Sequence, residues 1–199
     1  IRKLINDIYL LQLDLTVGYK TINLRRTNLV DFDIYLLFDY RENLKEKITS
    51  ISKIEEDFII NSSGNFKIES RIKNLDSIRD KKTRYENKKE GGKVSTNKCF
   101  NDILGFRIII DSSIFDSVIN YVIGYTNCLN YTVRFRDSSK GEYRAYHFYS
   151  NVDNTTYPVE IQFWDEKYEK INKISHHRYK QNYININTNQ NIDEEEEDD

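Results

Sequence analysis

Apolar residues recur at helical spacing through the first sixty positions of the chain. Between residues 34 and 51 they fall at intervals of three, four and six to seven, which places them near one helix face. These positions are Ile34, Leu37, Phe38, Leu44, Ile48 and Ile51. The charged run RENLKEK fits the outer face. The spacing therefore predicts a helical N-terminal region over residues 1–60.

Strands and helices alternate after residue 60. The predicted elements are, in order, a strand over 66–70, a charged helix from Asn74 or Asp76 to Lys89, a strand over 106–110, a helix capped by Ser112 or Ser113 and ending near Gly124, strands over 131–136, 143–150 and 157–164, and a helix over 165–179. This order predicts an α+β (or α/β) domain, a mixed sheet of about five strands flanked by helices.

Acidic and basic residues are separated along the chain. The net charge is −2, but the last seven residues, DEEEEDD, are all acidic, so removing their seven negative charges leaves +5. With the Asn-rich ININTNQN before it, this block predicts a disordered tail over 183–199 and leaves 61–182 as the main domain. Between Glu69 and Lys98, ten Lys and Arg face five Asp and Glu. That basic segment suits phosphates or a polynucleotide, and equally an ordinary exposed helix.

Other features narrow the class of protein. No apolar run approaches the roughly 20 residues of a membrane span, and no signal peptide is visible. Cys99 and Cys128 are isolated, which favours two reduced thiols in a cytoplasmic protein. The chain starts at Ile1 and contains no Met, which predicts a fragment or a trimmed chain.

Cationic side chains line the predicted charged helix. Arg71 and Lys73 are two residues apart at a strand-to-helix junction, so both can point to the same side. Ser77, Lys81 and Arg84 follow at i, i+4 and i+7, which is one stripe of a helix. A hydroxyl and four cations arranged in this way can hold phosphates. A solvated basic face would have the same composition.

Two carboxylates belong to strands with buried character. Asp102 opens DILGFR, where it can hold Mg²⁺ together with substrate phosphates, and Arg107 can stack on a purine. A buried ion pair between the two, or a helix cap, is the alternative. Glu160 and Gln162 point away from the apolar side of VEIQFW. Glu160 can complete the metal site or accept a hydroxyl proton, although a partly exposed sheet face would also explain it.

Tyr143 and His147 share one face of the predicted strand GEYRAYHFYS. Together they can stack a base and contact a phosphate. Aromatic packing within the sheet is the alternative interpretation.

These clusters occur in a defined order. The pattern R-x-K-x3-S-x3-K-x2-R, D-x2-G-x-R, Y-x3-H and V-E-I-Q, ending in H-x2-Y-K from His176 to Lys180, resembles the synthetase domain of the RelA/SpoT family over residues 60–182. The short chain resembles the stand-alone small alarmone synthetases. It has no His-Asp metal motif, so we expect no hydrolase half. The resemblance also implies a nucleotidyltransferase-like fold.

The resemblance implies a Mg²⁺-dependent GTP diphosphokinase. Such an enzyme transfers the β,γ-pyrophosphate of ATP to the ribose 3′-hydroxyl of GDP or GTP, making the alarmone (p)ppGpp and releasing AMP. The implied roles are adenine stacking for Arg71 and Arg107; ATP phosphate binding for Lys73, Ser77, Lys81 and Arg84; Mg²⁺ binding for Asp102; Mg²⁺ binding or activation of the hydroxyl for Glu160; and acceptor binding for Tyr143, His147, Gln162 and Lys140.

The acceptor half departs from the family pattern. Lys140 lies one place closer to Tyr143 than in the usual Lys-x-Asn-Gly-Tyr, Glu142 precedes the tyrosine, and Trp164 and Asp165 replace the usual Arg-Thr. Two alternatives therefore stay open. One is a toxic relative that pyrophosphorylates tRNA 3′ ends or adenosine nucleotides, and the other is an inactive nucleotide- or RNA-binding module. A homo-oligomer is compatible with the resemblance.

Overall fold

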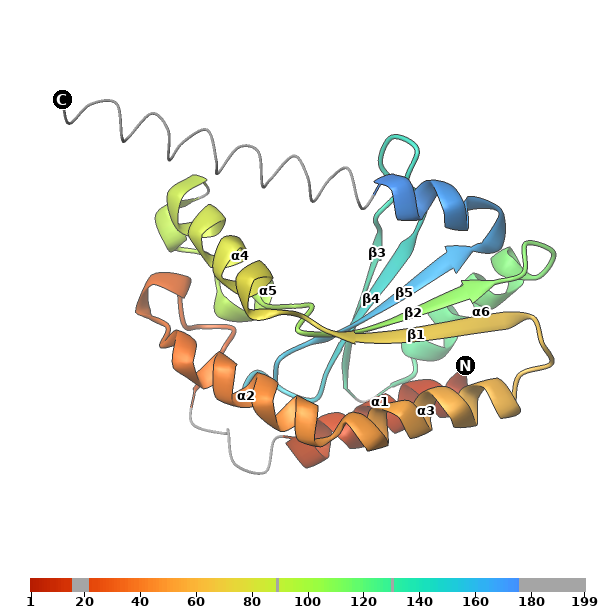
Figure 1. Cartoon of the computed structure of the whole chain (residues 1–199), viewed down its shortest axis with the longest axis horizontal. Helices are drawn as coiled ribbons and strands as arrows, with labels where there is room; N and C mark the ends of the chain where they lie inside the picture. Colours follow the sequence, from red (N-terminus) through yellow and green to blue (C-terminus); the bar gives the residue numbers. More distant parts are fainter. Residues whose placement is uncertain (16–21, 89, 130, 176–199) are drawn as a thin grey trace.

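Five strands form one mixed sheet with helices packed around it (Figure 1). The computed structural model describes residues 1–15, 22–88, 90–129 and 131–175. The strands are β1 (Phe66–Ile72), β2 (Leu104–Ile110), β3 (Thr132–Asp137), β4 (Tyr146–Asn151) and β5 (Val159–Asp165). The helices are α1 (Arg2–Leu15), α2 (Ile34–Glu46), α3 (Ile48–Ile60), α4 (Leu75–Lys88), α5 (Thr96–Cys99) and α6 (Phe115–Thr126). Residues 166–175 are helical as well. The predicted α+β fold class, with its mixed sheet of about five strands, is confirmed.

The strand order is β1-β2-β5-β4-β3. β2 and β5 run parallel, and the other neighbouring pairs are antiparallel. The end of β1 therefore lies beside the beginnings of β2 and β5. The register pairs Arg71 with Gly105 and Gly105 with Glu160. Residues far apart in the sequence thus meet at one edge of the sheet.

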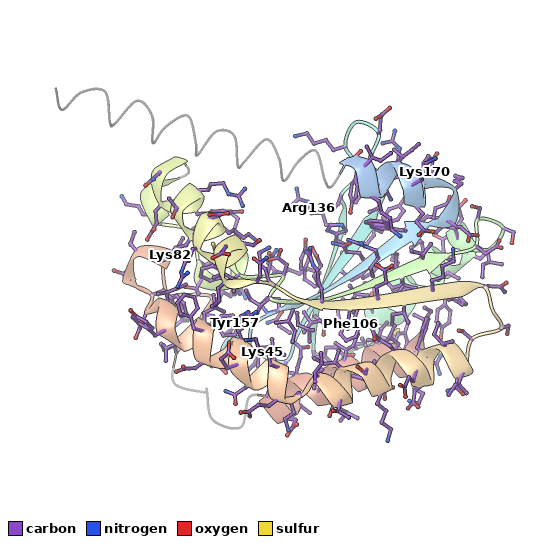
Figure 2. The ribbon with its side chains drawn as sticks, viewed as in Figure 1. Lys45, Lys82, Phe106, Arg136, Tyr157 and Lys170 are labelled. Atoms are coloured by element: carbon purple, nitrogen blue, oxygen red, sulfur yellow. The ribbon has the colours of Figure 1, made fainter. Side chains whose placement is uncertain are left out.

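The sheet has one apolar face and one polar face. Phe106, Ile108, Ile161 and Phe163 are buried in a core shared with α1, α2, α3 and α6. Figure 1 shows α1, α2 and α3 along this side, and Figure 2 labels Phe106 there and Arg136 on the opposite side. The alternate residues of the same strands, among them Glu160, face away from the core.

The N-terminal helices pack into this same core. α1 buries Leu4 and Ile8, and its buried Gln12 donates hydrogen bonds from Nε2 to the backbone oxygens of Ser150 (2.9 Å) and Tyr157 (3.1 Å). No described helix is both long enough and apolar enough to cross a membrane. The boundary predicted at residue 60 stays a prediction, but it does not separate two cores in the described structure.

The single apolar stripe predicted from residue 34 to residue 51 is wrong at Ile48. The chain turns at Lys47, which ends α2 and precedes α3. Ile48 opens the second helix and is 51% exposed, whereas Leu37, Leu44 and Ile51 are buried as predicted.

Other local predictions are also corrected. The strand predicted from Tyr143 begins at Tyr146. Neither candidate serine caps α6, because Ser112 Oγ donates to Asp165 Oδ1 (2.5 Å) and Ile114 precedes the helix without a side-chain cap. The helix predicted over 165–179 is described only to residue 175. The predicted tail and the motif from His176 to Lys180 lie outside the described residues.

Candidate active site

Polar side chains lie in two rows across the polar face of the sheet, because neighbouring strands place alternate residues side by side. The first row runs from β3 to β1 through Arg134, Tyr149, Glu160, Gly105 and Arg71. The second row runs in the same direction through Arg136, His147, Gln162, Arg107 and Glu69. Five of the predicted site residues therefore share one face of the sheet.

Asp102 lies two residues before β2 and is held by two lysines. Lys73 Nζ is 2.6 Å from its Oδ2 and Lys81 Nζ is 2.9 Å from its Oδ1. Burial alone would raise the pKa of Asp102, but the ammonium groups of Lys81 and Lys73 outweigh it and hold that pKa well below its ordinary value. Burial lowers the pKa of Lys73, although Asp102 opposes that change. The carboxylate and two of the four predicted phosphate ligands, Lys73 and Lys81, thus lie together at one point.

The predicted phosphate-binding stripe follows α4. Asn74 Oδ1 accepts from the backbone N–H of Ser77 (2.8 Å), so the helix begins where the sequence predicts. Ser77, Lys81 and Arg84 are half-buried along it. Lys81 also donates to Asn101 Oδ1 (3.0 Å), which holds the ammonium group at the start of β2.

Arg71 connects the two predicted metal ligands. Its Nη2 lies 3.8 Å from Asp102 Oδ2 and 3.9 Å from Glu160 Oε2. The two carboxylates are therefore no farther apart than these two lengths taken together. Arg71 and Arg107 border a hollow of about 40 Å³ above Gly105. A Cβ atom at position 105 would contact the Arg71 side chain, whose Nε would lie 3.7 Å away.

Arg107 and Asp102 bind different partners, so the ion pair considered between them is not formed. Arg107 Nε donates to Gln162 Oε1 (3.1 Å), and its Nη1 lies 3.5 Å from Glu69 Oε2. Its guanidinium carbon is 3.8 Å from the centroid of the Trp164 ring, which is a close cation–π contact.

Glu160 is 5% exposed and is surrounded by donors. Tyr149 donates its hydroxyl to Oε1 (3.0 Å), His147 Nδ1 lies 3.1 Å from the same oxygen, and Gln162 Nε2 donates to Oε2 (2.7 Å). Burial alone would raise the pKa of Glu160, but the contact with His147 outweighs it and leaves that pKa below its ordinary value. The partly exposed sheet face considered from the sequence is therefore wrong for this residue.

The predicted acceptor residues gather beyond Glu160. The Tyr143 hydroxyl lies 3.0 Å from His147 Nε2, and burial raises the pKa of Tyr143 to about 12. Tyr143 is not on β4 but closes a tight turn, in which its backbone exchanges two hydrogen bonds with Lys140 (3.0 and 3.1 Å). Gly141 takes a φ of +59° there. The Lys140 side chain is exposed on this turn.

Several residues on the polar face were missed from the sequence. Tyr149 contacts Glu160, and Arg134 and Arg136 extend both rows on β3. The alternation in TVRFRD could have indicated the two arginines, since it puts them on one strand face. Arg41, whose Nε donates to the backbone oxygen of Lys73 (2.7 Å), had no sequence signal because α2 and β1 meet only in the fold.

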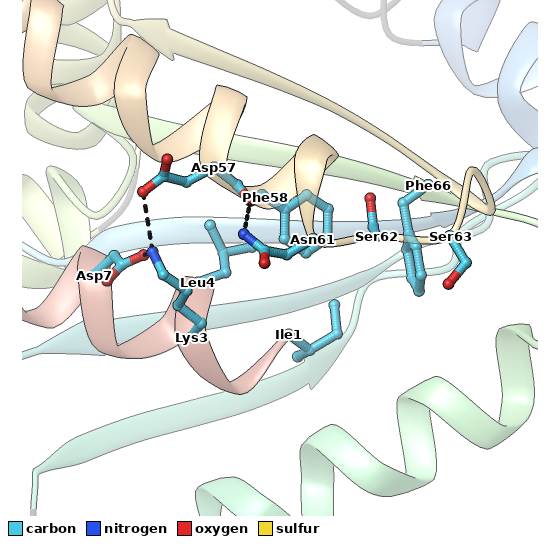
Figure 3. A pocket seen from close by; sticks show the side chains of 10 residues that line it. All are labelled: Ile1, Lys3, Leu4, Asp7, Asp57, Phe58, Asn61, Ser62, Ser63 and Phe66. Atoms are coloured by element: carbon cyan, nitrogen blue, oxygen red, sulfur yellow. Dashed lines mark hydrogen bonds and ion pairs between the residues drawn. The ribbon is translucent and has the colours of Figure 1, made fainter.

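A second hollow, of about 160 Å³, contains none of the predicted site residues (Figure 3). It lies between α1, the end of α3 and the start of β1. Its lysine, Lys3, is already paired with Asp7 (2.7 Å) and Asp57 (3.1 Å). The predicted chemistry is therefore concentrated on the polar face of the sheet.

A family model described as "Region found in RelA / SpoT proteins" matches residues 70–184. The chain belongs to the RelA/SpoT family. The matched region begins one residue before Arg71, and every residue predicted for the site lies inside it.

Solved structures with the same fold include small alarmone synthetase 1 from Bacillus subtilis. It is 22% identical, with a TM-score of 0.50 over 75% of this chain and 80% of that one. The crystal structure of that enzyme bound to its product pppGpp is 22% identical, with a TM-score of 0.46 over 74% of this chain and 80% of that one. The crystal structure bound to AMPCPP is 20% identical, with a TM-score of 0.45 over 75% of this chain and 78% of that one. The expected nucleotidyltransferase-like fold is confirmed. No curated protein sequence is significantly similar to the chain.

Proposed function

We propose that the protein transfers the β,γ-pyrophosphate of ATP to the ribose 3′-hydroxyl of GDP or GTP, making (p)ppGpp and releasing AMP. The observation that carries this proposal is the position of Glu160. It lies between a cationic centre, made by Lys73, Lys81 and Arg71 around Asp102, and the aromatic pair Tyr143 and His147. A donor phosphate on one side and an acceptor hydroxyl on the other would meet at this carboxylate.

On the donor side, Arg71 and Arg107 would hold the adenine between their guanidinium planes, above Gly105. Lys73, Ser77, Lys81 and Arg84 would bind the phosphates. The hollow is much smaller than the roughly 300 Å³ or more of a typical ligand pocket. The two arginines would therefore move apart when ATP binds.

Asp102 and Glu160 would hold Mg²⁺. Their oxygens are the hard ligands that this ion takes, and Mg²⁺ commonly binds to one or two carboxylates together with substrate phosphates. Both are buried and lie on either side of Arg71 Nη2. Among the described residues no group of three or more His, Cys, Asp or Glu side chains forms a metal site, so the phosphates would complete the shell. When bound, the ion would withdraw charge from the phosphates.

In the transfer, the 3′-oxygen attacks the β-phosphorus of ATP, the bond from that phosphorus to the oxygen bridging it to the α-phosphorus breaks, and AMP leaves with that oxygen. The hydroxyl proton passes to Glu160. The pKa of Glu160 lies below its ordinary value, so the carboxylate is ionised at neutral pH and has a free charge for the proton, although the shift makes it a weaker base than an ordinary glutamate. The positive charges of Lys73, Lys81 and Arg84, held in place by the fold, would stabilise the negative charge on the transferred group without any covalent bond to it.

On the acceptor side, Tyr143 would stack the base, while His147, Gln162 and Lys140 would contact its ribose or phosphates. Arg134 and Arg136 lie on the same face at the edge strand and add positive charge beside this site. The departures at Lys140, Glu142 and Trp164 motivate a second candidate function, in which a tRNA 3′ end or an adenosine nucleotide is the acceptor in place of GDP or GTP.

The experiment is an acceptor panel. The protein is incubated with Mg²⁺ and ATP labelled at the γ-phosphate, together with GDP, GTP, ADP or bulk tRNA in separate reactions. We expect label on GDP or GTP. Label on tRNA or ADP, with none on a guanosine nucleotide, would show that tRNA or ADP is the acceptor instead of GDP or GTP. No transfer to any of the four would favour an inactive binding module.

A further inference from the structure

Trp164 is buried on the polar face of β5, outside the main core. It is 0% exposed and forms a small apolar cluster with Ile109, Ala145 and Tyr143. An indole has one polar group, Nε1–H, which must find a partner when the ring is buried. It is also the single tryptophan of the chain.

One face of the indole supports Arg107. The guanidinium carbon lies 3.8 Å from the ring centroid, well inside the distance at which a cation and an aromatic ring attract each other. Gln162 and Glu69 bind the edge of the same guanidinium. Trp164 and these two side chains hold the guanidinium of Arg107, which also borders the hollow above Gly105, where the proposed function places the adenine.

The polar edge of the indole holds Tyr143. Nε1 donates to the Tyr143 hydroxyl (3.2 Å), and the two rings meet edge to face, with centroids 5.9 Å apart. The same hydroxyl contacts His147 Nε2 (3.0 Å), and His147 Nδ1 reaches Glu160. Trp164 thus touches a donor-side residue with its face and an acceptor-side residue with its edge.

We propose that Trp164 is a positioning residue that fixes Arg107 for the adenine of the donor and Tyr143 for the base of the acceptor. This inference rests on the proposed function for its two ligands. It gives the two halves of Trp164 separable tasks, because stacking needs the ring and the hydrogen bond needs Nε1–H.

Two substitutions separate these tasks. Trp164→Phe keeps an aromatic ring beside Arg107 but removes the N–H group that binds Tyr143. We therefore expect the affinity for the acceptor to fall about fivefold, and the affinity for a non-hydrolysable ATP analogue to change less than twofold. Trp164→Leu removes both, so both affinities should fall about fivefold or more. Affinities are measured by calorimetry with the ATP analogue and with GDP, and circular dichroism confirms that each variant is folded. Arg107→Lys serves as a comparison that removes the guanidinium next to Trp164 and should weaken the ATP analogue more than GDP.

Binding is also read from Trp164 itself. The ATP analogue should change the fluorescence of this single tryptophan in the wild type, and this change should be lost in Arg107→Ala. Equal affinities of wild type and a folded Trp164→Leu variant for both ligands would overturn the inference. These binding measurements need no turnover. A protein that binds both nucleotides as described but transfers nothing would refute the proposed reaction and leave the role of Trp164 standing.

Discussion

Asp102 and its two lysines form a buried charge cluster whose members depend on each other. The side chains of all three are between 12% and 14% exposed. Replacing Asp102 by Asn would leave two ammonium groups buried without a counter-ion, which costs about 3 kcal/mol. We expect urea denaturation of Asp102→Asn to show that loss. Asp14→Asn, which removes an exposed pair with Lys47, should cost less than about 1 kcal/mol.

The same cluster sets a pH dependence. The pKa of Asp102 in the folded protein lies below its ordinary value of 3.8. Its stabilising contribution is therefore complete above about pH 5 and is lost as the pH falls through the folded value. The unfolding free energy of the wild type should fall in acid more steeply than that of Asp102→Asn. Parallel acid profiles would contradict this account of the cluster.

Glu160 carries the proton transfer in the proposed reaction. Glu160→Gln keeps the shape but removes the charge, so we expect turnover to fall at least about a hundredfold while the ATP analogue still binds. The matched control is Glu166→Gln, an exposed residue paired with Lys67, whose rate should stay within twofold of wild type. Wild-type turnover in a folded Glu160→Gln variant would remove this residue from the chemistry.

The sequence indicated which charged residues lie together on the polar face better than it indicated their contacts. Asp102 and Glu160 stood out because charges are rare in apolar strands. That Asp102 is paired with Lys73 and Lys81, or that Arg107 rests on Trp164, depends on the strand order. These partners are up to 57 residues apart in the sequence, and no local pattern encodes a pairing at that distance.

At the scale of elements, the turn before β4 sets the position of Tyr143. Gly141 has a φ of +59°, which a residue with a side chain adopts at a cost of roughly 1 kcal/mol. Gly141→Ala meets no neighbouring atom, so its effect isolates the backbone. We expect lower stability by that amount and a raised KM for the acceptor with the KM for ATP unchanged.

Gly124 provides the control for this prediction. It lies within α6 and also has open space around it, without the left-handed backbone. Gly124→Ala should raise stability by about 0.5–1 kcal/mol and leave both KM values unchanged. Equal effects of the two substitutions would contradict the role given to the turn.

The apolar pattern and the turn signals predicted several elements close to their observed bounds. β1, β2, β5 and α4 all lie close to their predicted positions. The errors fall where local geometry overrides the pattern. The apolar spacing continues past Lys47 although the helix ends there, and aromatic residues around the Lys140–Tyr143 turn imitate a strand.

For the whole molecule, the helices before residue 60 are part of the body that supports the polar face. Leu4 and Leu10 both lie on α1, but Leu4 is 1% exposed in the common core and Leu10 is 60% exposed. Leu4→Ala should cost about 3 kcal/mol and unfold the sheet and helices in one transition, whereas Leu10→Ala should be nearly neutral. Two separate transitions in Leu4→Ala would indicate independent N-terminal and sheet units.

The central claim is that the two outer phosphates of ATP leave together. ATP labelled at the α-phosphate is mixed with the protein, Mg²⁺ and GDP, and the nucleotides are separated over time, with the label and the ultraviolet absorbance of each recorded. The account predicts AMP, formed in equal amount to a guanosine product that has gained two phosphates. Labelled ADP in place of AMP would show transfer of one phosphate, and unchanged ATP would show no transfer; either result would contradict the assignment.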